Sequence, residues 1–127
     1  MLKVLPGFPD DVLAVEGIGE VTAEDYRNVL IPAALAKMKQ HKHLKLFCHL
    51  GSQFKGLSAG AAWQDTKLGI AHWGDWGRLA VVTDTGWITD AVRLFAPLFH
   101  HPVRAFPNAE VESAKSWIKE AEPRKAA

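Results

Sequence analysis

Side chains that could bind a metal or transfer protons are scattered along this chain. Asp65 and Asp84 lie near expected strand ends, but neither has a partner that would make it a general base. Cys48 lies in an apolar run and is interpreted as a small buried hydrophobic residue. The histidines lack the spacing of a structural zinc site; they are His41, His43, His49, His72, His100 and His101. We therefore predict no catalytic residue, no metal site and no cofactor.

Motifs for nucleotide binding and hydrolysis are also missing. The stretch Gly17–Gly19 lacks the third glycine of a dinucleotide fingerprint, and no phosphate-binding Gly-Lys-Ser/Thr occurs. The net charge is +1, from 15 basic and 14 acidic residues, which gives no electrostatic footprint for nucleic acid. One cysteine, no signal peptide and no apolar stretch of about 18 residues predict a soluble cytoplasmic protein.

Apolar residues are unusually dense in the segment Trp87–Phe99, with sequence WITDAVRLFAPLF. Nine of its thirteen residues are apolar, and only Asp90 and Arg93 are charged. At about 100° per residue, one broad helical face contains Trp87, Ala91, Leu94, Phe95 and Leu98. A surface helix usually has a narrower apolar stripe. The additional apolar side chains predict that part of this helix is buried by a ligand, by a membrane interface or by a second copy of the chain.

Tryptophans are concentrated around the same segment. Four of the five lie within 25 residues, at Trp63, Trp73, Trp76 and Trp87. Tryptophan suits a ligand pocket or an interface, although core packing is the more common role for any one of them. The small residues of Ala59–Ala62 leave room for a ligand beside a helix or allow close packing against the sheet.

These patterns lead to a hypothesis in which Gly86–Phe99 is a mobile lid. Gly86 and Pro97 would be its hinges, and the pocket beneath would be lined by Trp63, Trp87 and Phe95, with Ala62 at the ligand. The residues assigned to the lid or to membrane contact are Gly86, Trp87, Ile88, Leu94, Phe95, Leu98 and Phe99. The alternative is a helix buried in the core and a dimer interface, and the sequence leaves both open.

Strand and helix patterns alternate along the chain. Thr22 is expected to cap the first helix, which Pro32 should kink, and Asn108 is expected to cap the last. The expected strands are Leu2–Leu5, Asp11–Ile18, Leu44–Leu50, Arg78–Thr83 and His101–Phe106, and the expected helices are Ala23–Gln40, Ser58–Trp73, Gly86–Phe99 and Asn108–Ala121. The first two strands should form an antiparallel hairpin, and the others should pair in parallel through right-handed crossovers.

The predicted fold is therefore α/β, with a mixed five-stranded sheet, about four helices and the order β-β-α-β-α-β-α-β-α. One domain is expected over residues 1–122, because the chain has the length of a single domain. Residues 123–127 are expected to be a disordered tail.

Several features of Phe54–Phe99 carry a family resemblance. They are Gly56, the run Ala61–Asp65 (AAWQD), the strand end Val81–Asp84 (VVTD), Trp87, and Leu94-Phe95. With these features, the chain resembles the SpoIIAA-like family of the STAS superfamily. The resemblance implies a mixed sheet with helices packed on it. It also implies two functional themes, namely phospho-regulated partner binding, as in anti-anti-sigma factors, and lipid binding, as in Sec14-like domains.

Ser58 is the residue on which the first theme depends. The resemblance implies a phosphorylated serine at the start of the second helix, and Ser58 occupies that region. The local motif departs from the family pattern, because no acid precedes Ser58 and Ala59 replaces the second hydroxyl residue. From the residues alone, Ser58 is a favoured N-cap that needs no regulatory role.

Our preferred prediction is a non-enzymatic domain that binds a hydrophobic or lipid-like molecule under the third helix. It would associate peripherally with the inner face of the membrane. The alternative is a phospho-regulated protein–protein interaction module with a regulatory protein partner. A homodimer is compatible with either function.

Overall fold

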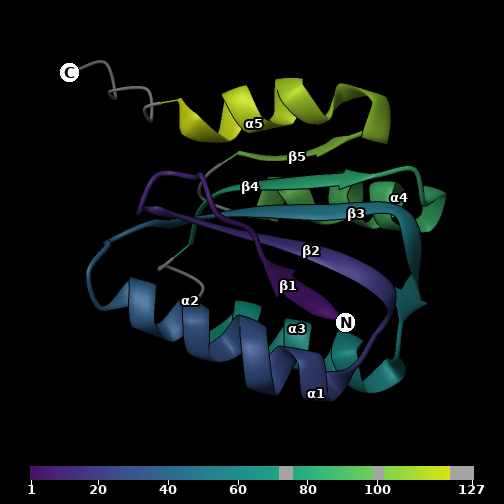
Figure 1. Cartoon of the computed structure of the whole chain (residues 1–127), viewed down its shortest axis with the longest axis horizontal. Helices are drawn as coiled ribbons and strands as arrows, with labels where there is room; N and C mark the ends of the chain where they lie inside the picture. The colour runs from purple at the N-terminus through teal and green to yellow at the C-terminus, as the bar shows by residue number, and fades with distance from the viewer. Residues whose placement is uncertain (72–75, 99–101, 121–127) are drawn as a thin grey trace.

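Figure 1 shows the computed structural model of the chain, in which residues 1–71, 76–98 and 102–120 are described. The described residues form a five-stranded sheet with the order β1-β2-β3-β4-β5. Strand β1 (Leu2–Val4) pairs antiparallel with β2 (Val12–Val21). Strands β3 (Leu44–Leu57), β4 (Trp76–Thr83) and β5 (Val103–Phe106) extend the sheet in parallel. The predicted mixed sheet and its hairpin are confirmed.

Strand β3 is twice as long as the sequence pattern indicated. The strand was expected to end at Leu50, and that expectation is wrong, because the strand continues to Leu57 beside the end of β2. The pairing passes through irregularities near Gly19 and Gly56, where β3 contains more residues than β2. Both glycines have positive φ, 64° and 132°, a conformation that other residues rarely adopt. Pairing with β2, rather than local alternation, therefore extends this strand.

The first helical segment begins at Thr22 and is not uniform. It comprises α1 (Ala23–Asp25), a π-helical turn η1 (Tyr26–Leu30) and α2 (Ile31–Met38). The Thr22 hydroxyl accepts the amide of Asp25, and the Asp25 carboxylate accepts the amide of Thr22, so the predicted cap is confirmed as a capping box. Pro32 lies in the first turn of α2, directly after η1. The wider π turn accommodates the proline, which has no N–H to donate and would crowd the preceding turn.

The remaining helices begin where the sequence predicted, and their described parts lie within the predicted ranges. They are α3 (Ala59–Ala71), α4 (Gly86–Phe95) followed by the 3₁₀ turn η3 (Ala96–Leu98), and η4 (Asn108–Glu110) followed by α5 (Val111–Lys119). Asn108 is the first residue of η4 and makes no side-chain cap, so its predicted capping role is wrong. Trp73, Phe99 and His101, together with the predicted tail 123–127, lie outside the described residues. The domain limits of 1–122 therefore stay a prediction.

The helices cover both faces of the sheet, as Figure 1 shows, with α1, α2 and α3 on one side and α5 on the other. The core under the first group is centred on Leu13, Val15, Leu30 and Leu44. The core under α5 contains Phe47, Val82, Phe106, Ala114 and Ile118. Helix α4 packs against β4 and β5. Because each parallel crossover advances by one strand, right-handed connections place α3 and α4 on the same face.

Two buried cations hold the C-terminal end of α5 on the sheet. The ammonium of Lys45 donates to the carbonyl of Glu120 (2.8 Å), and the guanidinium of Arg78 donates to the carbonyl of Trp117 (3.1 Å). Both side chains are less than 10 % exposed. The last carbonyls of a helix carry partial negative charge and lack partners within the helix, so cations stabilise them. Among the described residues, no helix is long and apolar enough to cross a membrane.

Candidate functional site

The connection from β4 to α4 is held by short side-chain hydrogen bonds. The hydroxyl of Thr83 accepts the amide of Thr85 (3.0 Å), directly before the first residue of α4. The carboxylate of Asp84 accepts the backbone amide of Asn108 (2.9 Å) and its side-chain amide (3.2 Å). Asp84, which the sequence marked as a possible base, therefore ties the end of β4 to the start of η4.

Only some of the apolar side chains of helix α4 and the following turn η3 contact the sheet. Ile88 is buried, and Ala91 and Val92 are half-buried. The large side chains of Trp87 (57 % exposed), Leu94 (71 %), Phe95 (52 %) and Leu98 (59 %) remain in solvent. At about 100° per residue, Trp87, Leu94 and Leu98 lie within roughly 40° of one another, and Phe95 lies between them and Ile88. We call Trp87, Leu94, Phe95 and Leu98 the α4 stripe.

The pocket residues predicted from the sequence are on the surface in this conformation. Trp63 on α3 is 63 % exposed, and Ala62 beside it is also exposed. Because Trp63, Trp87 and Phe95 are all more than half exposed, they do not enclose a cavity here. Their predicted role in ligand binding and the predicted motion of the lid stay predictions. Asp65 is on α3, and its side chain lies outside the described part of the chain.

Ser58 lies where two helices begin side by side. Its hydroxyl accepts the amide of Ala61 (3.0 Å), so the predicted N-cap of α3 is confirmed. Its own amide donates to the carbonyl of Val21 (2.9 Å), which places it next to the capping box at Thr22. A side chain at Gly60 would come within 3.0 Å of the Cβ of Ala23, so the starts of α1 and α3 are tightly packed. Ser58 itself is half-exposed.

Asp25 in this region is held in its charged form. Burial raises the pKa of its carboxyl, but the Thr22 amide, the chain's N-terminal ammonium and the Thr22 hydroxyl together lower that pKa below its ordinary value. The ammonium of Met1 lies 3.1 Å from the carboxylate. A negative charge is also favoured in the first turn of a helix. The region therefore combines two helix N-termini with one paired carboxylate.

A protein-family model decides the classification. The SpoIIAA-like model matches residues 12–119, which is most of the chain. The chain belongs to the SpoIIAA-like family. Its fold agrees with a solved structure of an uncharacterized protein from Shewanella loihica PV-4, described as a member of the DUF3478 family with a SpoIIAA-like fold. That structure is 26% identical, with a TM-score of 0.72 over 92% of this chain and 93% of that chain. No match is found among the curated proteins.

Membership in the SpoIIAA-like family confirms the resemblance stated from the sequence, and with it the STAS-type architecture. The strands that lead to Ser58 and α4 in this SpoIIAA-like fold end at the same edge of the sheet, because β2, β3 and β4 are parallel. Ligand sites in open α/β sheets commonly lie beyond this carboxyl edge.

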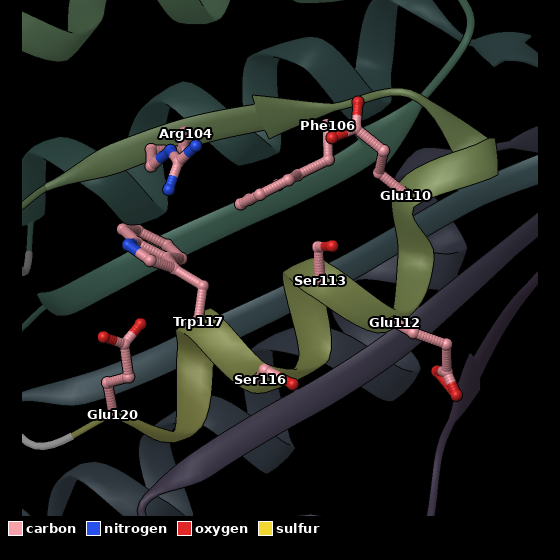
Figure 2. Close-up of a pocket in the computed structure, with 8 residues that line it drawn as sticks. All are labelled: Arg104, Phe106, Glu110, Glu112, Ser113, Ser116, Trp117 and Glu120. Atoms are coloured by element: carbon pink, nitrogen blue, oxygen red, sulfur yellow. The ribbon is translucent and has the colours of Figure 1, made fainter.

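One feature of this SpoIIAA-like chain was missed by the sequence analysis. A shallow cavity of about 560 Å³ lies between β5 and α5. Figure 2 shows the residues that line it. Arg104 and Phe106 project into it from β5, and Trp117 faces them from α5. Its other lining residues are polar, namely Glu110, Glu112, Ser113, Ser116 and Glu120. The sequence could have indicated this site, because Arg104 and Phe106 are two positions apart in the last strand. Residues at this spacing project from the same face of a strand.

The histidines with described partners link segments that are distant in the sequence. The His41 ring lies 2.7 Å from the Asp10 carboxylate, and Lys37 donates to the backbone carbonyl of Asp10 (2.7 Å). The hydrogen bonds from His41 and Lys37 lower the pKa of the Asp10 carboxyl. His49 lies 3.9 Å from Glu16 on the neighbouring strand. Within the described ranges, no three histidine, cysteine, aspartate or glutamate side chains group as metal ligands.

Proposed function

We propose that this SpoIIAA-like protein is a non-catalytic binding domain that takes up a hydrophobic, lipid-like molecule at α4. The same surface would rest on a membrane. The observation that carries the proposal is the α4 stripe, four large apolar side chains that are each more than half exposed. Isolated exposed apolar residues are ordinary, but a contiguous group on one helix is typical of an interaction site.

The chemistry of the α4 stripe favours a lipid-like occupant. Leu94, Leu98 and Phe95 offer hydrocarbon surface without charge, and Trp87 adds an indole whose N–H can remain in a polar layer. A helix with one apolar and one polar side, lying in an interface, buries its apolar side at the boundary of headgroups and acyl chains. The exposed Arg93 lies about 100° from Leu94 around the helix, whereas the exposed Asp90 lies about 40° from Leu94 and marks the polar border of the stripe.

Lid motion would begin at the N-terminus of α4. Thr85 precedes the helix without a side-chain cap, and a side chain at Gly86 would meet open space. The variant Gly86→Ala therefore introduces no clash, and it restricts only the backbone freedom that a hinge would use. If Gly86 is a hinge, the variant should slow hydrogen exchange in Trp87–Phe95 and weaken ligand uptake, while the melting temperature stays the same or rises.

Native mass spectrometry of the protein from its own host tests the proposal directly. We expect a bound hydrophobic molecule, and co-sedimentation with vesicles of phosphatidylethanolamine and phosphatidylglycerol. A ligand-free protein that ignores vesicles, with α4 as protected from hydrogen exchange as the central strands, would refute both lid and lipid binding. A dimer that protects α4 in the absence of lipid would assign the stripe to a second copy instead.

A second candidate function is phospho-regulated binding of a protein partner at Ser58. It is supported by the family and by the half-exposed Ser58 hydroxyl at the N-terminus of α3. A phosphate there would lie beside free helix N–H groups and the positive end of the helix dipole. Intact-mass analysis of the protein from its own host should then detect a form heavier by one phosphate, absent in Ser58→Ala. An unmodified mass under all growth conditions would leave Ser58 as a helix cap alone.

A further inference from the structure

Strand β5 leaves one edge of the sheet open. It is last in the strand order and pairs with β4, and no other described strand lies beside it. The amide of Leu79 donates to the carbonyl of Pro102 (3.1 Å), and Leu79 is in register with Val103. In a parallel ladder, this arrangement points the N–H and C=O groups of Val103 and Ala105 away from β4. An open strand edge of this kind can pair with another extended chain.

A cavity accompanies this open edge. Arg104 and Phe106 alternate with Val103 and Ala105, so their side chains project from β5 toward α5 (Figure 2). The Phe106 and Trp117 rings lie 5.8 Å apart between centroids. A strand added beside β5 would therefore find backbone partners at the edge and aromatic surface beside them.

Arg104 supplies the charge that selects an occupant. Its guanidinium lies 4.7 Å from the centroid of the Phe106 ring and 5.4 Å from that of Trp117, so the rings hold it in place. Arg104 is exposed, and no carboxylate among the described residues lies within ion-pair distance of it. A planar guanidinium with free N–H groups binds a carboxylate through two parallel hydrogen bonds.

Two of the three carboxylates that line the cavity have cationic neighbours, and the third, Glu110, lies at the Phe106 end (Figure 2). Glu112 lies 3.3 Å from Lys115, one turn along α5, and Glu120 lies 3.8 Å from Arg78. Arg78 also lies 5.0 Å from the centroid of the Trp117 ring. Of the two guanidinium groups beside Trp117, Arg78 is buried near Glu120, and the exposed Arg104 is the one placed to bind a negatively charged partner group.

A second copy of the chain is a poor occupant of this edge. An antiparallel β5–β5 pairing that used the outward groups of both Val103 and Ala105 would set Arg104 directly opposite its counterpart. Like charges at directly opposed positions of an antiparallel pair are destabilising. A partner strand with a carboxylate at the same position would replace this repulsion with an ion pair.

We propose that the edge of β5 binds an extended acidic peptide of a partner protein as a sixth strand. The backbone of the peptide would pair with Val103 and Ala105, and an aspartate or glutamate side chain would bind the guanidinium of Arg104. This surface differs from both α4 and Ser58, so the inference stands independently of the function proposed there.

Selection from a display library of random eight-residue linear peptides tests the inference. We expect the selected peptides to share one aspartate or glutamate at a fixed position within a β-branched stretch. A synthetic selected peptide should slow hydrogen exchange at the amides of Val103 and Ala105. Selection of no peptide, or of peptides that protect other segments, would overturn the inference.

Variants separate the two parts of the site. Ala105→Pro removes an outward N–H without touching the ladder to β4, and Arg104→Glu reverses the selecting charge. Each should weaken peptide binding by about two- to tenfold, because each removes a hydrogen bond or an ion pair. The matched control Ala105→Ser keeps the N–H and should retain most of the binding. Arg104→Lys keeps the charge but not the two parallel hydrogen bonds, so its affinity should lie between those of the wild type and Arg104→Glu.

Two further outcomes are decisive. Unchanged peptide affinity in Arg104→Glu would overturn the inference. Because Arg104 is exposed, this variant should stay folded and can be measured even if Ala105→Pro unfolds the protein. A dimer seen by native mass spectrometry and abolished by Arg104→Glu or Ala105→Pro would assign the edge to a second copy and overturn the inference as well.

Discussion

Replacing Leu94 and Leu98 together with serine should remove most membrane binding without unfolding the protein. Complete burial of a leucine side chain stabilises by about 1.5 to 3 kcal/mol. Leu94 is 71 % exposed and Leu98 is 59 % exposed, so most of this gain is still available to an external partner. The two losses together amount to about 2 to 4 kcal/mol, which corresponds to a decrease in vesicle partitioning of about 30-fold or more.

The stability of the folded state should change little in this double variant. Substitutions at exposed positions away from caps and cores usually alter the free energy of unfolding by about 0.5 kcal/mol or less each. The assay is co-sedimentation with phosphatidylethanolamine–phosphatidylglycerol vesicles over a range of lipid concentrations. Urea denaturation of the same samples measures the free energy of unfolding.

Leu35 on α2 provides the matched control. It is also an exposed leucine, at 37 %, but it lies outside the α4 stripe. Leu35→Ser should therefore leave vesicle partitioning unchanged. Equal losses in Leu35→Ser and in the double variant, or no loss in either, would refute the argument that the α4 stripe carries the binding.

Three other predictions probe the parts of the fold that position these sites. Ser58→Ala should lower the free energy of unfolding by about 1 kcal/mol in urea denaturation, because the amide of Ala61 loses its cap; no change would contradict the capping role. Arg78→Ala should cost about 2 to 4 kcal/mol, since it leaves a cavity and an unpaired carbonyl at the end of α5, whereas the exposed Arg104→Ala should cost less than about 1 kcal/mol. The stability advantage of the wild type over Asp25→Asn should be complete above pH about 5 and shrink as the pH falls below 3.8, because folding lowers the Asp25 pKa from that value; a difference that is constant between pH 3 and 6 would contradict the pairing.

Features fixed by neighbouring residues were predictable from the sequence. The caps at Thr22 and Ser58 depend on a hydroxyl and an amide three positions later, and both are present as predicted. The hairpin of β1 and β2 follows from a turn between two apolar runs. The parallel order of the later strands follows from their alternation with helices.

Features fixed by distant contacts were not predictable in the same way. The second half of β3 has no regular alternation, and it is a strand because the end of β2 pairs with it. Asn108 has the residue type of a cap, but its side chain binds Asp84, which is 24 positions away. The cavity beside Arg104 depends on α5 returning across the sheet, which no local pattern in β5 indicates.

The orientation of α4 depends both on its local sequence pattern and on contacts with distant residues. The sequence establishes that the apolar arc runs from Leu94 and Leu98 through Phe95 to Ile88 and Val92, but not which part of this arc faces the sheet. Helix α4 contacts β4 and β5 with its Ile88 side buried, and the rest of the arc remains in solvent. A helix selected only for packing would need no apolar residue at positions 94 and 98, because polar side chains there would contact water at no cost to the core. The mismatch between the apolar arc and the buried arc is therefore the physical reason to assign α4 a binding role beyond its structural one.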